Sequence, residues 1–184
     1  MKPTDELKHE HEAIKLMLRI LESAGRMLET GEKVDAADLE GMLEFIRTFA
    51  DKCHHHKEED LLFPALQKVG VPKEKGPIGV MLMEHESGRN FVRGMAEGIE
   101  KYKSGAPNAY RQIAANARNY VKLLSEHISK EDNVLYPIAD ARLSGKDQET
   151  LHNEFSRVER EIVGEGKHEE FHRLLDRLQK KYLK

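Results

Sequence analysis

The sequence predicts an all-α protein: an up-down-up-down four-helix bundle followed by two additional C-terminal helices. Three observations favour this fold class. Apolar residues recur with helical period in four long segments, glycine and proline punctuate the chain between them, and no stretch alternates apolar with polar residues as a half-buried strand would. Because the predicted turns are short, neighbouring helices should run antiparallel.

The first predicted helix begins after Thr4, a suitable N-cap, and ends before Gly31. The second begins near Asp35 and stops at Gly70. Gly76-Pro77 starts the third, because proline suits the first helical turn, and Pro107 starts the fourth. The apolar stripes of these helices are, in order, Leu7, His11, Ile14, Leu18 and Leu21; Leu39, Leu43, Ile46, Ala50, Leu61 and Ala65; Ile78, Met81, Leu82, Val92 and Ile99; and Ile113, Tyr120, Leu123, Leu124, Val134 and Ile138.

Two shorter amphipathic helices are predicted after Gly145, separated by Gly164 and Gly166. Their apolar faces are Leu151, Phe155, Val158 and Ile162, and then Phe171, Leu174, Leu175, Leu178 and Tyr182. Each would be marginal alone, so we expect them to pack on the bundle or on a partner subunit. The predicted organisation is therefore a four-helix bundle over residues 1–143 and a helical extension over residues 144–184.

The composition excludes several classes of protein. The 184 residues include 30 Lys+Arg and 33 Asp+Glu, a net charge of −3, whereas a nucleic-acid groove needs a clustered basic excess. No apolar run is long enough to span a bilayer, and the charged start of the chain is unlike a signal peptide. The single cysteine, Cys53, excludes an internal disulfide framework and is typical of a reducing compartment. We therefore expect a cytoplasmic protein with neither nucleic-acid nor membrane partners.

The ten histidines reveal an internal repeat. The segment from His54 to Pro64 aligns with that from His127 to Pro137 at an offset of 73 residues, and His, Lys, Glu, Leu and Pro recur at the same places. The tripeptide Glu10-His11-Glu12 aligns with Glu84-His85-Glu86 at an offset of 74 residues. Two pairs with nearly the same offset indicate a duplicated helical hairpin with a pseudo-twofold axis through the bundle.

The repeated residues suit a metal centre. His54 with Glu58, and His127 with Glu131, lie four residues apart and so share a helix face, while His11 and His85 interrupt apolar stripes. Burying such groups is costly unless they are paired or bind a cation. Two divalent metals resolve the cost if each takes two imidazoles and the carboxylates bridge them, with positions left open for a small ligand. The predicted metal ligands are His11, His54, Glu58, His85, His127 and Glu131. Nitrogen and carboxylate donors favour iron, with manganese and zinc as competitors.

Alternatives remain at this stage. Eleven residues make about three α-helical turns, so residues eleven apart share a helix face. The residue eleven before His54 is the apolar Leu43, whereas the residue eleven before His55 is the polar Glu44. His56 is a second choice that would pair with Asp60, and Glu59 could replace Glu58. A metal-free bundle with hydrogen-bonded core histidines is the alternative interpretation, but the repetition of the pattern at one offset, with partner histidines, favours the metal site. His9, His55, His56, His152, His168 and His172 receive no role.

Five other side chains carry expectations. Tyr120 lies on the same helix face as His127 and is predicted to be a core residue. Lys15 and Arg89 occupy matched positions one turn after His11 and His85, where they could balance carboxylates such as Glu12 and Glu86. Pro64 and Pro137 predict a kink or a helix end.

These residues resemble the hemerythrin-like, or HHE cation-binding, domain family over residues 1 to 143. The resemblance implies two non-haem irons joined by an oxo or hydroxo bridge and two carboxylates, with the six residues above as ligands. Classical oxygen-carrying members have a further histidine one turn after the third-helix histidine, where this sequence has Arg89, and their last carboxylate is an Asp five residues after its histidine. The centre is therefore more similar to the six-ligand sites of iron-centre repair proteins.

The expected function is that of a di-iron protein whose centre binds or reacts with O2, peroxide or nitric oxide. This expectation includes catalytic turnover of peroxide or nitric oxide. The alternative is a metal- or oxygen-dependent sensing module that acts on a partner through its last two helices. The expected partners are a small diatomic or peroxide ligand and an unidentified redox or protein partner. The chain would be a monomer or a homodimer.

Overall fold

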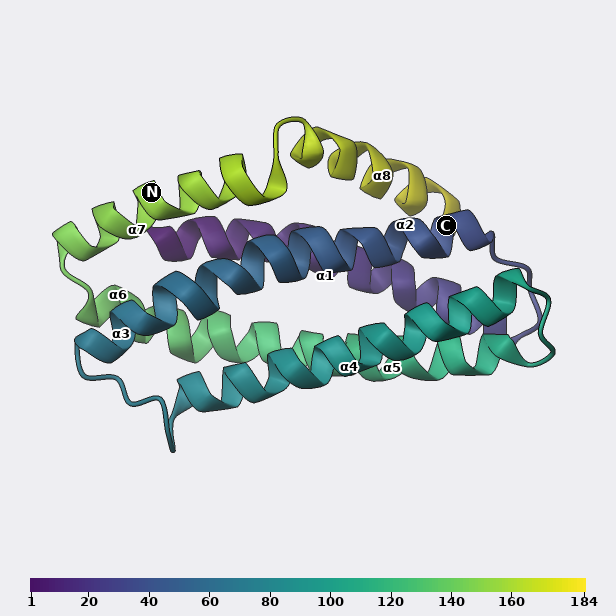
Figure 1. The fold of residues 1–184 in the computed structure, drawn as a ribbon, viewed down its shortest axis with the longest axis horizontal. Coiled ribbons are helices and arrows are strands. Elements are labelled where there is room, and N and C mark those ends of the chain that lie inside the picture. Colours follow the sequence, from purple (N-terminus) through teal and green to yellow (C-terminus); the bar gives the residue numbers. More distant parts are fainter.

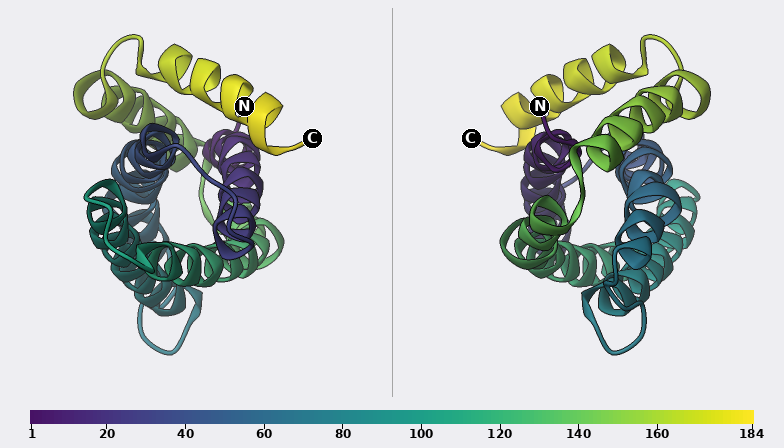
Figure 2. Two further views of the ribbon diagram at one scale, coloured as in Figure 1. Left: turned by 90° about the vertical axis from the view of Figure 1, so that its right-hand side faces the viewer. Right: turned by 90° about the vertical axis from the view of Figure 1, so that its left-hand side faces the viewer.

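The computed structural model describes residues 1–184, which form helices and connecting turns with no strand. Four long helical columns surround a common centre (Figures 1 and 2). The first column is α1 (Pro3–Glu29) and the third is α4 (Pro77–Lys103). The loops between columns lie at alternating ends of the molecule (Figure 1), so each column runs antiparallel to the next.

The second and fourth columns contain π-helical turns, in which hydrogen bonds join residues five apart. The second column consists of α2 (Ala36–Phe45), η1 (Ile46–His55), η2 (Lys57–Leu62) and α3 (Phe63–Lys68). The fourth consists of α5 (Ala109–Lys130), η3 (Glu131–Leu135) and α6 (Tyr136–Arg142).

Two predicted helix starts were displaced by a few residues. The first helix begins at Pro3, not after Thr4, because proline fits the first helical turn; the Thr4 hydroxyl donates instead to Asp140 at 2.5 Å. The fourth helix begins at Ala109, not at Pro107, because Asn108 takes a left-handed conformation with φ of 63° that interrupts the helix.

The π-helical turns also displace the apolar stripes. Leu62 and Leu66 are buried in the second column, whereas the predicted Leu61 and Ala65 are only partly buried. The same one-residue shift puts Leu135, Ala139 and Val163 in the core in place of Val134, Ile138 and Ile162. A π-helical turn holds about one residue more than an α-helical turn, so residues beyond it rotate relative to the α-helical period.

The two repeated prolines do not end their columns. Pro64 and Pro137 lie in the first turns of α3 and α6, immediately after the π-helical turns. Proline has no N–H to donate, and the first turn of a helix is where that donor is not needed. The prolines therefore mark the return from i→i+5 to i→i+4 hydrogen bonding, and the helical column continues through them (Figure 1).

Two apolar clusters form the core at opposite ends of the bundle. The larger has 27 buried residues and includes Leu18, Phe45 and Ile113, and the smaller has 13 and includes Leu7, Phe63 and Ile78. The predicted ligands occupy the interval between them. A polar centre is thus held on both sides by rigid apolar packing.

The last helices lie along the side of the bundle formed by the first two columns (Figure 2). They are α7 (Gly145–Val158), η4 (Glu159–Val163) and α8 (Lys167–Tyr182). Phe155 of α7 belongs to the smaller apolar cluster, and Phe171, Leu175 and Leu178 of α8 belong to the larger. The extension therefore completes both clusters from one side and leaves the α4–α5 side uncovered.

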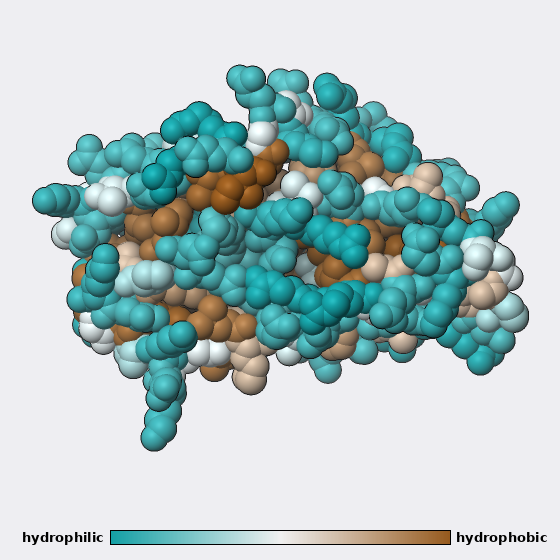
Figure 3. Space-filling model, viewed as in Figure 1, coloured by the Kyte–Doolittle hydropathy of each residue, from teal (hydrophilic) through white to brown (hydrophobic).

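The molecular surface is mainly polar. Figure 3 shows hydrophilic side chains over most of the face drawn, with apolar side chains visible mainly in the seams between helices. None of the helices combines the length and the apolar character that crossing a membrane requires.

Candidate metal centre

The structure brings all six predicted ligands together in the middle of the bundle. Each column contributes: His11 from α1, His54 and Glu58 from the second column, His85 from α4, and His127 and Glu131 from the fourth. All six side chains are buried. The imidazoles form two pairs across the axis, since the Nε2 atoms of His11 and His54 are 3.0 Å apart and those of His85 and His127 are 3.1 Å apart.

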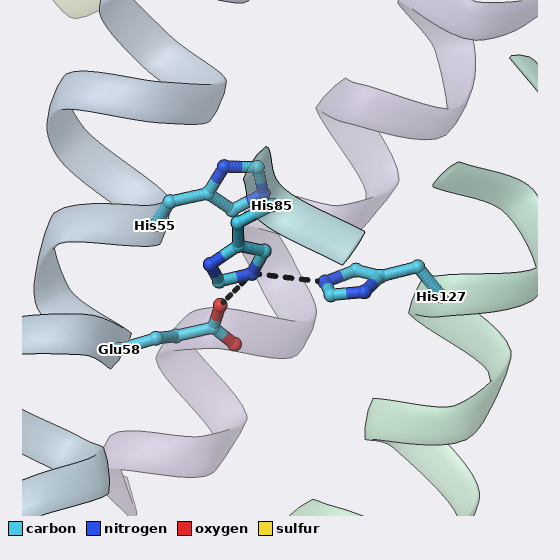
Figure 4. Close-up of side chains that lie close together, drawn as sticks. All are labelled: His55, Glu58, His85 and His127. Carbon is cyan, nitrogen blue, oxygen red and sulfur yellow. Dashed lines mark hydrogen bonds and ion pairs between the residues drawn. The ribbon is translucent and has the colours of Figure 1, made fainter. Parts of the chain in front are cut away.

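The two carboxylates lie between the imidazole pairs. One oxygen of Glu58 is 3.7 Å from His54 Nε2 and the other is 3.3 Å from His85 Nε2 (Figure 4). Glu131 repeats the arrangement, with oxygens 2.8 Å from His127 Nε2 and 3.1 Å from His11 Nε2. Each carboxylate therefore faces one imidazole of each pair, which is the arrangement that a bridge between two metal ions needs.

Several oxygens of this centre lack hydrogen-bond donors. Glu58 Oε2 and both oxygens of Glu131 are fully buried and accept no hydrogen bond. A buried carboxylate oxygen without a donor costs about 1–3 kcal/mol or more. Bound cations would remove that cost, so the residues present fit a metal pair.

A second carboxylate lies behind each imidazole. The Nδ1 atoms of His11, His54 and His127 lie 2.7, 3.0 and 3.1 Å from oxygens of Asp132, Glu10 and Glu84, and that of His85 lies 3.4 Å from Glu59. Because a carboxylate only accepts, the Nδ1 atoms of His11, His54 and His127 carry the proton, and their Nε2 atoms can direct a lone pair at a metal. His85 Nδ1 makes no hydrogen bond, although Glu59 lies beside it. These four carboxylates obey the same repeat as the ligands.

Basic side chains hold these outer carboxylates. Lys57 and Lys130, which are repeat partners, donate to Glu10 at 2.7 Å and to Glu84 at 2.5 Å. Arg89 donates to Glu59 at 2.6 Å. Each imidazole is thus oriented by a carboxylate that is itself fixed.

Lys15 and Arg89 do meet carboxylates, although not only the expected ones. Lys15 lies 3.1 Å from Glu12 and 3.6 Å from Asp132. Arg89 lies 3.6 Å from Glu86, but its shorter contacts are with Glu59 and Asp51.

The alternative ligands lie outside the centre. His56 is partly exposed and pairs with Asp60 at 2.9 Å. Glu59 faces Nδ1 of His85 and the guanidinium of Arg89, away from the imidazole Nε2 atoms. Tyr120 is buried in the larger apolar cluster, as the sequence suggested.

The charges of the metal-free centre follow from its carboxylates. Burial alone would lower the pKa of His11, but the neighbouring carboxylates of Asp132 and Glu131 raise it to about 9. Burial would also lower the pKa values of His127 and His85. The neighbouring carboxylates outweigh burial and raise these values to about 9 for His127 and about 11 for His85. The pKa of Glu131 stays well below its usual range, because the neighbouring imidazoles outweigh the effect of burial. Metal binding would therefore displace protons from the histidines.

Tyr136 is a residue of the centre that the sequence reasoning missed. Its hydroxyl donates to Glu58 Oε1 at 2.6 Å and lies 3.3 Å from His11 Nε2. Burial and the carboxylates of Glu131 and Glu58 raise the pKa of this phenol well above 10, so it remains a donor. Its repeat partner is Phe63, whose ring is stacked 6.1 Å from His85. The exchange of Phe for Tyr within an otherwise matched motif was the available signal.

The prediction that His55 lies on the polar side of its helix was wrong. His55 is 5% exposed, and its ring stacks on that of His85 with centroids 3.9 Å apart (Figure 4). It lies within η1, where the eleven-residue α-helical step no longer applies. Its repeat partner is Ile128, also buried, and that apolar match was the missed signal. Burial and the neighbouring imidazoles lower the pKa of His55 well below 6.5, so its ring is neutral.

Lys57 was also missed. Its ammonium group is fully buried and donates to Glu6 at 3.0 Å, to Glu10 at 2.7 Å and to Glu159 at 2.9 Å. Its repeat partner Lys130 is 42% exposed, because no extension covers that half of the bundle.

A small pocket reaches the centre between η1 and α4. Its volume is about 170 Å³, and its lining includes His55 and His85 at the inner end and Arg93 at the surface. A pocket of this size admits a small molecule as far as the stacked His55 and His85 rings and is too small for a large organic substrate.

Comparison with known proteins agrees with this geometry. A family model described as the Hemerythrin HHE cation binding domain matches residues 2–139. This chain belongs to that family. The family assignment covers all four columns of the bundle, and every one of the six predicted ligands lies within the matched range.

Curated relatives match a shorter stretch. Proteins named "Iron-sulfur cluster repair protein YtfE" from Yersinia pestis (strain Pestoides F) and Yersinia pseudotuberculosis serotype O:1b (strain IP 31758) are 33% identical to this HHE-family chain over 107 residues. The match covers 56% of this chain and 46% of each relative. The chain thus matches about half the length of these relatives.

Proposed function

We propose that this chain is a cytoplasmic di-iron protein whose centre binds or reacts with O2, peroxide or nitric oxide as part of a response to iron or redox stress. The proposal rests on the two buried carboxylates, each of which faces one imidazole of each pair. Three of their four oxygens have no hydrogen-bond donor. Imidazole and carboxylate donors without thiolate suit iron. The relatives named for iron-sulfur cluster repair support the same metal.

The roles of the residues follow from their positions. His11 and His54 would hold one iron and His85 and His127 the other, with Glu58 and Glu131 as bridges. The bound irons would supply electrons for reaction with a small ligand. Tyr136 holds Glu58 in place through its hydroxyl, and the outer carboxylates fix the imidazole tautomers. The 170 Å³ pocket is consistent with a diatomic molecule or a peroxide as the partner.

Metal analysis with a visible spectrum tests the proposal. We expect two irons per chain and, after exposure of the reduced protein to oxygen or azide, charge-transfer bands of a bridged di-iron centre. Glu58→Ala and Glu131→Ala should each abolish stoichiometric loading, whereas Glu126→Ala, at an exposed position next to His127, should retain both irons. Full loading of both ligand variants, or zinc or manganese as the only metal with no such bands, would contradict it.

A sensing role is the second candidate, and one specific contact favours it. Glu10 holds His54 Nδ1 and also accepts from Lys57, which donates onward to Glu159 of η4. The centre is therefore joined to the C-terminal extension by a continuous chain of hydrogen bonds. In this role metal occupancy would change the stability of the extension. Hydrogen exchange with and without iron distinguishes the two candidates.

A further inference from the structure

His55 has the contacts of a metal ligand, although the repeat supplies no counterpart for it. Its Nδ1 lies 3.2 Å from Asp51 Oδ1, and its Nε2 is buried without a hydrogen-bond partner. The side chain is only 6% exposed. A buried nitrogen without a hydrogen-bond partner lowers the stability of the fold, so its presence requires a physical reason.

The contacts of Asp51 determine which nitrogen of His55 carries the proton. Arg89 Nε donates to both oxygens of Asp51, at 3.0 and 3.2 Å, which holds this carboxylate in place. Because the carboxylate only accepts, His55 must donate through Nδ1, and Nε2 then presents a lone pair. Three of the predicted histidine ligands, His11, His54 and His127, are arranged in the same way, with a carboxylate at Nδ1 and Nε2 toward the centre.

The surroundings of His55 contain the other donors that a metal needs. One ligand atom from each of His55, Glu58, His85 and His127 can be chosen so that all four lie within 4.8 Å of one another. The corresponding set in the other half is His11, His54, Glu58 and Glu131, with no third imidazole. Figure 4 shows the His55 ring over that of His85, on the same side of the bundle as Glu58.

We infer that His55 is a seventh metal ligand, which joins His85 and His127 on one metal and makes the two metal positions chemically different. The inference rests on the proposed di-iron function. One position then has three imidazoles, while the other has two imidazoles and the Tyr136 phenol nearby. The repeat partners of His55 and Tyr136 are Ile128 and Phe63. Each of these two departures from twofold symmetry therefore makes the two metal positions more unlike each other.

Anaerobic loading with ⁵⁷Fe²⁺ tests this assignment. In the wild type we expect two Mössbauer doublets of equal area from two different ferrous sites. His55→Phe keeps an aromatic ring against His85 but removes the donor, and it should change one doublet and weaken binding of one iron by about tenfold or more. His56→Phe is the matched control at the adjacent, partly exposed position, and it should leave both doublets unchanged.

A further variant separates ligation from packing. His55→Ala opens space beside the pocket, so added imidazole should restore the wild-type spectrum and the second iron if His55 is a ligand. A His55→Phe protein with two irons and an unaltered spectrum would overturn the assignment, and so would a His55→Ala protein whose lost iron is not recovered with imidazole. Failure of the wild type itself to bind two irons would instead refute the proposed di-iron function.

Discussion

Single side chains determine how far the centre departs from twofold symmetry. The ligands, their outer carboxylates and the basic residues behind those carboxylates all occur in matched pairs. Tyr136 faces Glu58 where the other half has Phe63 near His85, and His55 lies where the other half has Ile128. Two substitutions are therefore enough to give two halves of one repeat different chemistry.

Replacement of Tyr136 tests the role of its hydroxyl. Tyr136→Phe removes a 2.6 Å hydrogen bond to a buried carboxylate and leaves Glu58 Oε1 without that donor. We expect the free energy of unfolding of the metal-free protein to fall by about 1.5–3 kcal/mol. Denaturant titration of both proteins measures the loss.

Tyr120→Phe serves as the control for that experiment, because Tyr120 is a buried tyrosine of the same bundle that makes no hydrogen bond to the centre. Its effect should stay within about 0.5 kcal/mol. Equal losses in the two variants would mean that the Tyr136 hydroxyl has no special role at Glu58.

That the six residues meet in the bundle centre could be predicted because the sequence carries their pattern twice. His11 and His85 interrupt apolar stripes, and His54 and His127 each precede a glutamate by four residues. The burial of Lys57 could not be predicted in the same way, since its repeat partner Lys130 is partly exposed. The burial of Lys57 depends on Glu159, which lies far along the chain and outside the repeat.

At the scale of elements, the positions of the helices along the sequence were predictable, but the face that each helix buries beyond a π-helical turn was not. Glycine and proline correctly separated the four columns and the two last helices. Within the second and fourth columns the π-helical turns rotate the residues beyond them, so Leu62 and Leu135 are buried in place of Leu61 and Val134. An α-helical period applied to the sequence has no means of detecting such turns, and the misplacement of His55 has the same origin.

The docking of α8 on α2 makes a prediction about acid stability. Asp38 of α2 accepts hydrogen bonds from Lys181 and Tyr182 at 2.6 Å and from Arg177 at 2.8 Å. Burial raises the pKa of Asp38, but these donors outweigh burial and lower the pKa to about 2. A carboxyl whose pKa is depressed on folding stabilises the protein above its unfolded pKa, and this stabilisation is lost as the pH falls through the folded value.

Asp38→Asn should therefore lower the free energy of unfolding by about 2 kcal/mol at pH 7. The difference from wild type should shrink to about half of that at pH 3, because the carboxyl of Asp38 is by then largely protonated in the unfolded state. Urea unfolding at several pH values measures it. Asp176→Asn, which removes an exposed pair with Lys180, should have little effect at any pH; a loss of stability from Asp38→Asn that does not vary with pH would contradict the prediction.

At the scale of the whole molecule, the extension makes the outer shell of the bundle unequal. It covers the first two columns and buries Lys57, while the α4–α5 side remains open (Figure 2). The route from His54 through Glu10 and Lys57 to Glu159 exists only in the covered half. A change at the centre can therefore reach η4 by direct contacts.

Hydrogen–deuterium exchange measures that connection. If the protein is a sensor, iron loading should slow exchange of the amides of residues 159–182 in the wild type. Glu159→Gln removes the far end of the route, so it should abolish this added protection while leaving iron binding unchanged. Glu161→Gln, at an exposed position in the same π-helical turn, is the control. Equal protection with and without iron in the wild type would favour the purely chemical role.

The internal repeat has a practical consequence. One chain contains two versions of the same half-site: one with a buried lysine and a covering helix pair, the other with a partly exposed lysine and an additional imidazole. Temperature, buffer, protein concentration and folding state are identical for the two versions by construction. Any signal that resolves the two halves therefore compares them within a single sample, so each half is the reference for the other.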